Sequence, residues 1–153
     1  MGKLDLSLTA EELEGYLATQ RTVRVATVGE DGTPHAIPLW FVWVDGTLFL
    51  NSTLGNTAVE NAFRRGVAAA VIDDGETYAE LRGALLTGPI EPADDDPRLP
   101  DVELAWSEKY LGGNPVPFKT WRNRVWLRLP PNRVASWDFR KIPEARAKAR
   151  KEA

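Results

Sequence analysis

The stretch Val23–Ser52, VRVATVGEDGTPHAIPLWFVWVDGTLFLNS, carries the clearest structural signal in the chain. β-Branched and aromatic residues alternate along it, and the runs are interrupted at Glu30-Asp31-Gly32 and again at Asp45-Gly46. Asp-Gly between two such runs is the strongest short-range signal of a β-hairpin. We therefore expect three antiparallel strands, over about 22–28, 35–44 and 47–51.

Signals outside this stretch complete the expected order of elements. Thr9 and Glu12 have the spacing of a capping box, which predicts a helix over residues 9–19. The later elements that we expect are a helix over about 57–65 ending near Gly66, strands over 67–74 and 78–93, a helix over 102–111, two strands within 124–139 and a helical tail over 143–153. Gly83 and Gly88, inside the second of those strands, indicate a bulge or the close approach of another group.

The number and spacing of these strands indicate the fold class. Five to seven strands with turn signals at short intervals predict a mainly β, α+β fold, an antiparallel barrel with peripheral helices. A length of 153 residues fits one domain. We therefore expect a single domain over 1–153, with its barrel spanning about 22–139.

Composition excludes several classes of function. The absence of cysteine excludes disulfides, thiolate metal sites and a cysteine nucleophile. A net charge of −3 gives no reason to expect a nucleic-acid partner. No apolar run approaches the roughly 20 residues that cross a bilayer, and the N-terminal stretch lacks the apolar core of a signal peptide. We expect a cytoplasmic protein that does not bind membranes.

Few side chains in the sequence suggest chemistry of their own. The single histidine, His35, begins a strand beside Pro34, and no G-x-S-x-G motif accompanies it, so a hydrolase triad is not expected. Asp94-Asp95-Asp96 lacks the spacing of a calcium loop, and a solvated loop is the better interpretation. No metal site is expected. If the protein is an enzyme, a cofactor carries the difficult chemistry.

Three segments together resemble a known family. An N-terminal helix precedes ATVGEDGTPHAIPLWFVWVDGTLFLNSTLGN and YAELRGALLTGPIE, and SWDFRK follows near the end. Their order and spacing resemble the pyridoxamine 5′-phosphate oxidase-like superfamily of FMN-binding split barrels, from about Leu13 to Phe139. Within it the chain is most similar to the actinobacterial flavin- and deazaflavin-dependent oxidoreductases that use coenzyme F420. The resemblance implies a homodimer with the cofactor at the interface.

The resemblance also implies which residues bind the cofactor. The segment that would lie along the flavin-type ring and offer backbone hydrogen bonds to its edge is Pro38, Leu39, Trp40 and Phe41. The residues that would face the cofactor phosphate are Asn51, Ser52, Thr53, Asn56 and Thr57. Trp137, in the segment SWDF, would line the cofactor pocket of its own subunit or of the partner subunit. No residue is identified as catalytic.

The expected phosphate turn departs from the pattern of the flavin-binding oxidases. In those oxidases the sequence of this turn resembles T-N-L-G-S-R-K. This chain has Thr57 and Ala58 at the positions of the arginine and the lysine. Each lost charged hydrogen bond would cost about 1.5–3 kcal/mol. The residues that could supply charge from elsewhere are Lys119, Arg122, Arg124 and Arg140. A flavin-contacting glutamine of the oxidases is also replaced, by Gly83, so a true pyridoxamine phosphate oxidase is not expected.

Three functions remain open on these observations. The first is an oxidoreductase that uses F420, or alternatively FMN, to pass a hydride to an unsaturated small-molecule acceptor. The second is a non-catalytic dimer that binds a flavin, a haem or another planar ligand with an altered phosphate site. The third is a structural dimer without a cofactor. For Trp40, Phe41, Trp43 and Trp137, simple barrel core is the plain alternative to ligand contact. Strand alternation places Phe41 and Trp43 on one face and Trp40 on the other.

Overall fold

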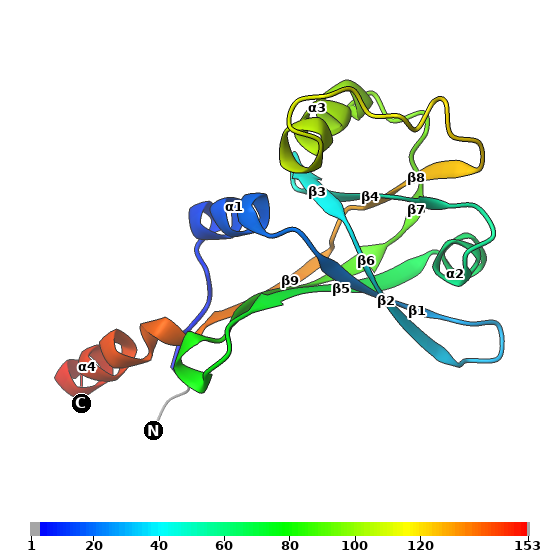
Figure 1. The fold of residues 1–153 in the computed structure, drawn as a ribbon. Coiled ribbons are helices and arrows are strands. Elements are labelled where there is room, and N and C mark those ends of the chain that lie inside the picture. Colours follow the sequence, from blue (N-terminus) through cyan, green and yellow to red (C-terminus); the bar gives the residue numbers. More distant parts are fainter. Residues whose placement is uncertain (1–3, 153) are drawn as a thin grey trace.

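The structure, a computed structural model, describes residues 4–152 and forms a split β-barrel of two antiparallel sheets (Figure 1). The five-stranded sheet has the order β2 (Pro34–Leu39), β1 (Val23–Val28), β5 (Val67–Asp74), β6 (Arg82–Pro89) and β9 (Arg133–Asp138). The four-stranded sheet has the order β3 (Phe41–Val44), β4 (Thr47–Thr53), β8 (Arg124–Leu129) and β7 (Glu91–Pro92). The mainly β, α+β fold expected from the strand pattern is confirmed.

Helices lie around the two sheets. They are α1 (Ala10–Thr19), α2 (Thr57–Arg65), α3 (Leu99–Tyr110) and α4 (Ile142–Glu152), with short 3₁₀ turns at Tyr78–Glu80 and Phe139–Lys141. Figure 1 shows α3 over the four-stranded sheet and α4 extending away from the barrel, and α4 has no buried residue. No helix within residues 4–152 is both long enough and apolar enough to cross a membrane.

Local signals explain where several elements begin and turn. The capping box of α1 is confirmed, because Thr9 N donates to Glu12 at 2.7 Å and Glu12 N donates to the Thr9 hydroxyl at 3.2 Å. Asp45 and Gly46 both have positive φ, 47° and 68°, as the tight turn between β3 and β4 requires. α2 also ends as expected, at Gly66, which adopts the left-handed conformation at φ 66°.

The expected continuous strand over 35–44 is wrong, because the chain leaves one sheet and enters the other at Trp40. β2 pairs with β1, whereas β3 pairs with β4. The backbone at the break bonds to a side chain: Phe41 N donates to the Tyr110 hydroxyl at 3.0 Å. The alternation of residue types continues through Trp40, so the sequence gives no local sign of the break.

Two apolar cores bury both faces of the four-stranded sheet. The first core fills the space between the sheets and includes Leu17 of α1, Val59 of α2, and Phe41, Leu48 and Leu50 of the smaller sheet. The second lies under α3 and joins Val42, Phe49, Val102, Trp106 and Trp126. Trp43 packs against the first core and Trp40 is exposed, so the expected alternation is confirmed.

Three other expectations about the chain are corrected. α3 begins at Leu99 rather than at residue 102. The expected long strand over 78–93 begins as a 3₁₀ turn at Tyr78–Glu80 and divides into β6 and β7 at Ile90. Asp96 is not solvated: its carboxylate is 1% exposed and pairs with Arg98 at 2.8 Å and Arg128 at 2.9 Å.

The two glycines of β6 mark close approaches, as expected. A Cβ added to Gly83 would lie 2.4 Å from the Trp137 ring, which stands opposite it on β9, and 2.8 Å from the Ile72 carbonyl oxygen. A Cβ on Gly88 would lie 2.8 Å from the Pro130 carbonyl oxygen. The indole of Trp137 therefore fills the space that a side chain at position 83 would need.

Gly83→Ala is expected to lower the free energy of unfolding by roughly 1–2 kcal/mol, because the indole and the backbone must shift to admit a methyl group. Gly15→Ala is the matched control. Gly15 is in α1, where an added Cβ meets nothing within 4 Å, so alanine there should stabilise the helix by about 0.5–1 kcal/mol. Urea unfolding measures both changes, and an unchanged stability for Gly83→Ala would contradict this packing.

Candidate functional site

One cavity brings together most of the residues expected to bind the cofactor. It has a volume of about 460 Å³, within the usual range for small-molecule sites. Seven of the expected residues line it: Pro38, Leu39, Trp40, Asn51, Ser52, Thr53 and Asn56. The sheet register explains the convergence, because Phe41 pairs with Leu50 across β3 and β4. Trp40 and Asn51 are the next residues beyond that pair.

Trp40 forms the aromatic end of the cavity. Its ring stacks on Tyr110 with centroids 4.4 Å apart and planes 4° apart, and Trp106 lies tilted against it at 6.3 Å. Trp40 nevertheless remains 48% exposed. A flat indole supported by a second ring and open to the cavity is well suited to stack on a planar ligand.

Tyr110 holds this end of the cavity in place. Its hydroxyl accepts from Phe41 N and lies 2.8 Å from the carbonyl oxygens of both Phe41 and Arg21. Burial raises the pKa of Tyr110 to about 12, so the hydroxyl keeps its proton at neutral pH. Lys109 donates to the carbonyl oxygens of Leu17 at 3.1 Å and Phe41 at 3.2 Å, and burial lowers its pKa to about 8. Both side chains fix the backbone next to Trp40.

The other side chains that line the cavity are mainly polar, and they include Arg124. Arg124 Nε donates to Asn51 Oδ1 at 2.7 Å, and Arg124 Nη1 donates to the Thr53 hydroxyl at 3.1 Å. The Asn51 side chain is buried, and within residues 4–152 its Nδ2 group has no hydrogen-bond acceptor. A buried amide without an acceptor is uncommon in a folded protein. It therefore fits a ligand that offers an oxygen.

The start of α2 adds further donors beside Asn51. Asn56 is the residue before the helix, and its side chain makes no capping hydrogen bond to the first turn. Its Nδ2 group instead lies 3.5 Å from the Ser52 hydroxyl oxygen. The first N–H groups of a helix lack partners within the helix and lie at its positive end. This end of the cavity is therefore suited to an anionic group.

Three of the expected residues do not line this cavity. Phe41 is fully buried in the core between the sheets, because side chains alternate along β3. Thr57 is exposed on the first turn of α2 and does not line the cavity. Trp137 lies on β9 at the edge of the other sheet.

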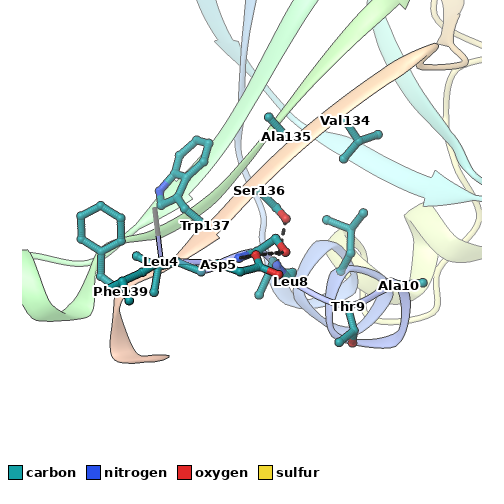
Figure 2. A pocket seen from close by; sticks show the side chains of 13 residues that line it. Leu4, Asp5, Leu8, Thr9, Ala10, Val134, Ala135, Ser136, Trp137 and Phe139 are labelled. Atoms are coloured by element: carbon teal, nitrogen blue, oxygen red, sulfur yellow. Dashed lines mark hydrogen bonds between the residues drawn. The ribbon is translucent and has the colours of Figure 1, made fainter. Parts of the chain in front are cut away.

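Trp137 lines a separate groove between the N-terminal segment and β9, with a volume of about 540 Å³ (Figure 2). Figure 2 shows Trp137 and Phe139 beside Leu4 and Asp5, with Leu8 N bonded to the Ser136 hydroxyl. The groove is mainly apolar, and the Asp5 carboxylate that lines it accepts from the Ser7 backbone and hydroxyl. The described residues that line it include no basic side chain, and we do not assign the cofactor to it.

Sequence reasoning missed two residues of the cavity and left a third undecided. Thr22 and Trp106 line it without having been singled out, because a threonine before a strand and a tryptophan within a helix have ordinary structural explanations. Arg124 was one of four candidate cations. Its position opposite Thr53 in the pairing of β4 with β8 identifies it among them. Within residues 4–152 no cluster of three or more metal-ligating side chains occurs.

Comparison with known proteins identifies similar chains. Residues 9–138 match the family model of pyridoxamine 5′-phosphate oxidase. A search of the curated proteins gave no match. Among solved structures, the conserved hypothetical protein Rv2991 from Mycobacterium tuberculosis superposes with a TM-score of 0.81 at 28% identity, covering 94% of this chain and 92% of its own.

Two more distant structures share the fold but differ in function. HutZ, the haem storage protein from Vibrio cholerae, has a TM-score of 0.67 at 16% identity, covering 84% of this chain and 93% of its own. An F420 reductase has a TM-score of 0.58 at 22% identity, covering 80% of this chain and 94% of its own. Since one fold serves both roles, the chemistry must be inferred from the site.

Proposed function

Because the chain belongs to the pyridoxamine 5′-phosphate oxidase family, we propose that it is an oxidoreductase that holds F420, or alternatively FMN, in the cavity beside Trp40. One observation carries the proposal: an exposed indole and an anion-suited polar end line the same cavity. F420 and FMN each combine a planar ring with a phosphate, and this cavity offers a complementary surface to both parts.

Each part of the cavity would have a separate role. Trp40, supported by Tyr110, would stack on the ring, while Pro38 and Leu39 would border it. The polar end, including Asn51, Ser52, Thr53 and Asn56, would hold the phosphate.

The protein's task in this reaction would be to orient two molecules and exclude water. When bound, the reduced deazaflavin or flavin supplies a hydride for an unsaturated small-molecule acceptor. The apolar surface around Trp40 would position that acceptor beside the ring, which contributes by proximity and orientation. Tyr110 keeps its proton at neutral pH but donates to backbone carbonyls, so it acts here as a positioning residue.

We also propose that a second copy of the chain completes the site. Trp40 is 48% exposed, and Trp121, which lies over the Arg124 guanidinium, is 53% exposed. Large apolar side chains exposed together commonly mark an interaction surface. In such a homodimer, Trp137 of the partner subunit could close the ring pocket. Light scattering after gel filtration tests this, and a monomer at all concentrations would contradict it.

The site favours a flavin-type ligand over haem among the planar ligands. The described residues that line the cavity include no histidine, cysteine, methionine or tyrosine, the side chains that usually bind haem iron. A non-catalytic flavin-binding protein would use the same residues. Turnover therefore separates the enzyme from that alternative.

The test of the proposed reaction is oxidation of the reduced cofactor in the presence of acceptors. Reduced F420 and reduced FMN are each mixed with the protein and a panel of activated alkenes and quinones, and cofactor and product are followed. Enzyme-dependent oxidation that is saturable in acceptor supports the oxidoreductase. Binding of the cofactor with no oxidation above the protein-free rate for any acceptor would favour the non-catalytic alternative.

A further inference from the structure

We propose that Arg124 supplies the positive charge for the cofactor phosphate, in place of the two cations missing from the turn after β4. This inference rests on the proposed function, because it concerns the polar end of the same cavity. It assigns the phosphate-binding role to a residue on β8, about 70 positions after the turn in which the flavin-binding oxidases carry their basic residues.

The hydrogen bonds of Arg124 fix its guanidinium and leave donors available. Its side chain bonds to Asn51 Oδ1 at 2.7 Å, to the Thr53 hydroxyl at 3.1 Å and to the Asn51 carbonyl oxygen at 3.4 Å. Phe118 and Trp121 lie over it, with ring centroids 5.0 and 5.7 Å from Cζ. A guanidinium has five N–H donors, so at least one remains for an anion while the side chain is held by its neighbours.

The charge of Arg124 has no counter-ion within residues 4–152. No carboxylate in the described chain lies within ion-pair distance of it. Asp94 and Glu103 line a smaller cavity that Arg124 and Asn51 also line, but neither carboxylate pairs with Arg124. Among residues 4–152, Arg124 is also the only charged side chain that lines the Trp40 cavity. Burial lowers the pKa of Arg124, as expected for a cation with no anion beside it.

Asn51 provides a second indication of a ligand, one that offers an oxygen atom. Its side-chain oxygen accepts a hydrogen bond from Arg124 Nε, while its Nδ2 group is buried and lacks an acceptor in the described structure. Asn51 is 5% exposed and lines the cavity together with Ser52 and Asn56, next to the uncapped start of α2. An oxygen of a phosphate group there would accept from Asn51 and from Arg124 together.

The other candidate cations are placed less suitably. Lys119 is exposed and lines the smaller cavity behind Arg124. Arg122 is exposed and does not line either cavity. Arg140 pairs with Asp138 at 2.6 Å, beyond the end of β9 in the other sheet. These positions leave Arg124 as the cation that reaches the polar end of the site.

Pairs of ligands that differ only in phosphate test the assignment. Calorimetric titrations with FMN and riboflavin, and with F420 and its phosphate-free chromophore, are made on the natural protein, Arg124→Gln, Arg124→Lys and Arg122→Gln. Arg124→Gln is expected to raise the Kd of the phosphate-bearing ligand about 10–100-fold. It should change the Kd of the phosphate-free ligand by less than about twofold. Arg124→Lys should recover part of the loss, and Arg122→Gln should have no effect.

Failure of this assignment can be distinguished from failure of the proposed function. If Arg124→Gln weakens both members of a pair equally, or neither, Arg124 does not hold the phosphate and the assignment is wrong. If the natural protein binds none of the ring ligands, the cofactor proposal fails, and inorganic phosphate becomes the probe. If inorganic phosphate shifts the NMR signals of Asn51 and Arg124, and Arg124→Gln abolishes these shifts, the anion site at Arg124 is supported. If phosphate causes no such shifts, the anion site is overturned.

Discussion

Trp40→Ala is expected to raise the Kd of the cofactor about 10–100-fold, because the cavity loses the flat surface on which the ring stacks. Stacking of a planar base on an aromatic side chain contributes about 1–3 kcal/mol when measured by alanine substitution. Trp40 lies on the surface of the cavity with 48% of its area exposed. Its removal should therefore affect binding much more than folding.

Trp40→Phe is the matched control for this prediction, because it retains a flat ring on the Tyr110 platform. It should restore most of the affinity. The phosphate-free ligands are the most sensitive probes, because the indole should stack on the ring and these ligands lack the phosphate that Arg124 would bind. If Trp40→Ala and the natural protein have equal cofactor affinities and equal thermal stability, the cofactor ring does not stack on Trp40 and the prediction is wrong.

Asp96→Asn is expected to lower the free energy of unfolding at neutral pH by about 3 kcal/mol, within the range for breaking a buried ion pair. The Asp96 carboxylate accepts four hydrogen bonds, from the backbone and side chain of Arg98 and from Arg128. Arg98 also donates to the Thr47 hydroxyl at 2.9 Å. The cluster therefore joins the start of α3 to β4 and β8, and α3 carries the rings that support Trp40.

The effect of Asp96→Asn should depend on pH in a definite direction. Arg98 first, and then Arg128, hold the pKa of Asp96 well below its usual value. A carboxylate whose pKa is depressed on folding stabilises the protein above its unfolded pKa, about 3.9. That stabilisation is lost as the pH falls through the folded value. The difference between Asp96→Asn and the natural protein should therefore be full at pH 7 and shrink below about pH 4.

Urea unfolding at several pH values measures this difference. The neighbouring Asp95 is exposed, so Asp95→Asn should change stability by less than about 0.5 kcal/mol. If Asp96→Asn behaves like Asp95→Asn at neutral pH, the buried cluster does not contribute as described.

The strand pattern predicted most of the barrel because its signals are local. The Asp45-Gly46 turn, the capping box at Thr9 and the glycine that ends α2 each depend on residues a few positions apart. The change of sheet at Trp40 depends on Tyr110, 69 residues after Phe41. No local pattern could show it, and the strand was expected to continue.

For the site, too, the sequence predicted some residues, while others could be identified only from contacts between segments distant in the chain. The resemblance placed Trp40 and Asn51 in one site, and the structure places them at a single cavity. The choice of Arg124 among four basic residues required the register that sets it opposite Thr53. The burial of Asp96 could not be read from three consecutive aspartates, because both arginine partners become neighbours only through packing around β8.

The most direct measurement is a fluorescence titration of the protein with F420 and with FMN, side by side. Trp40 and Trp106 both line the cavity, so a ring bound there should quench tryptophan emission. The account predicts saturable quenching by F420, or alternatively by FMN, with one site per chain, and a midpoint at about 10–100-fold higher ligand concentration in Trp40→Ala. Saturation by neither ligand would contradict the central claim that this cavity holds a flavin-type cofactor.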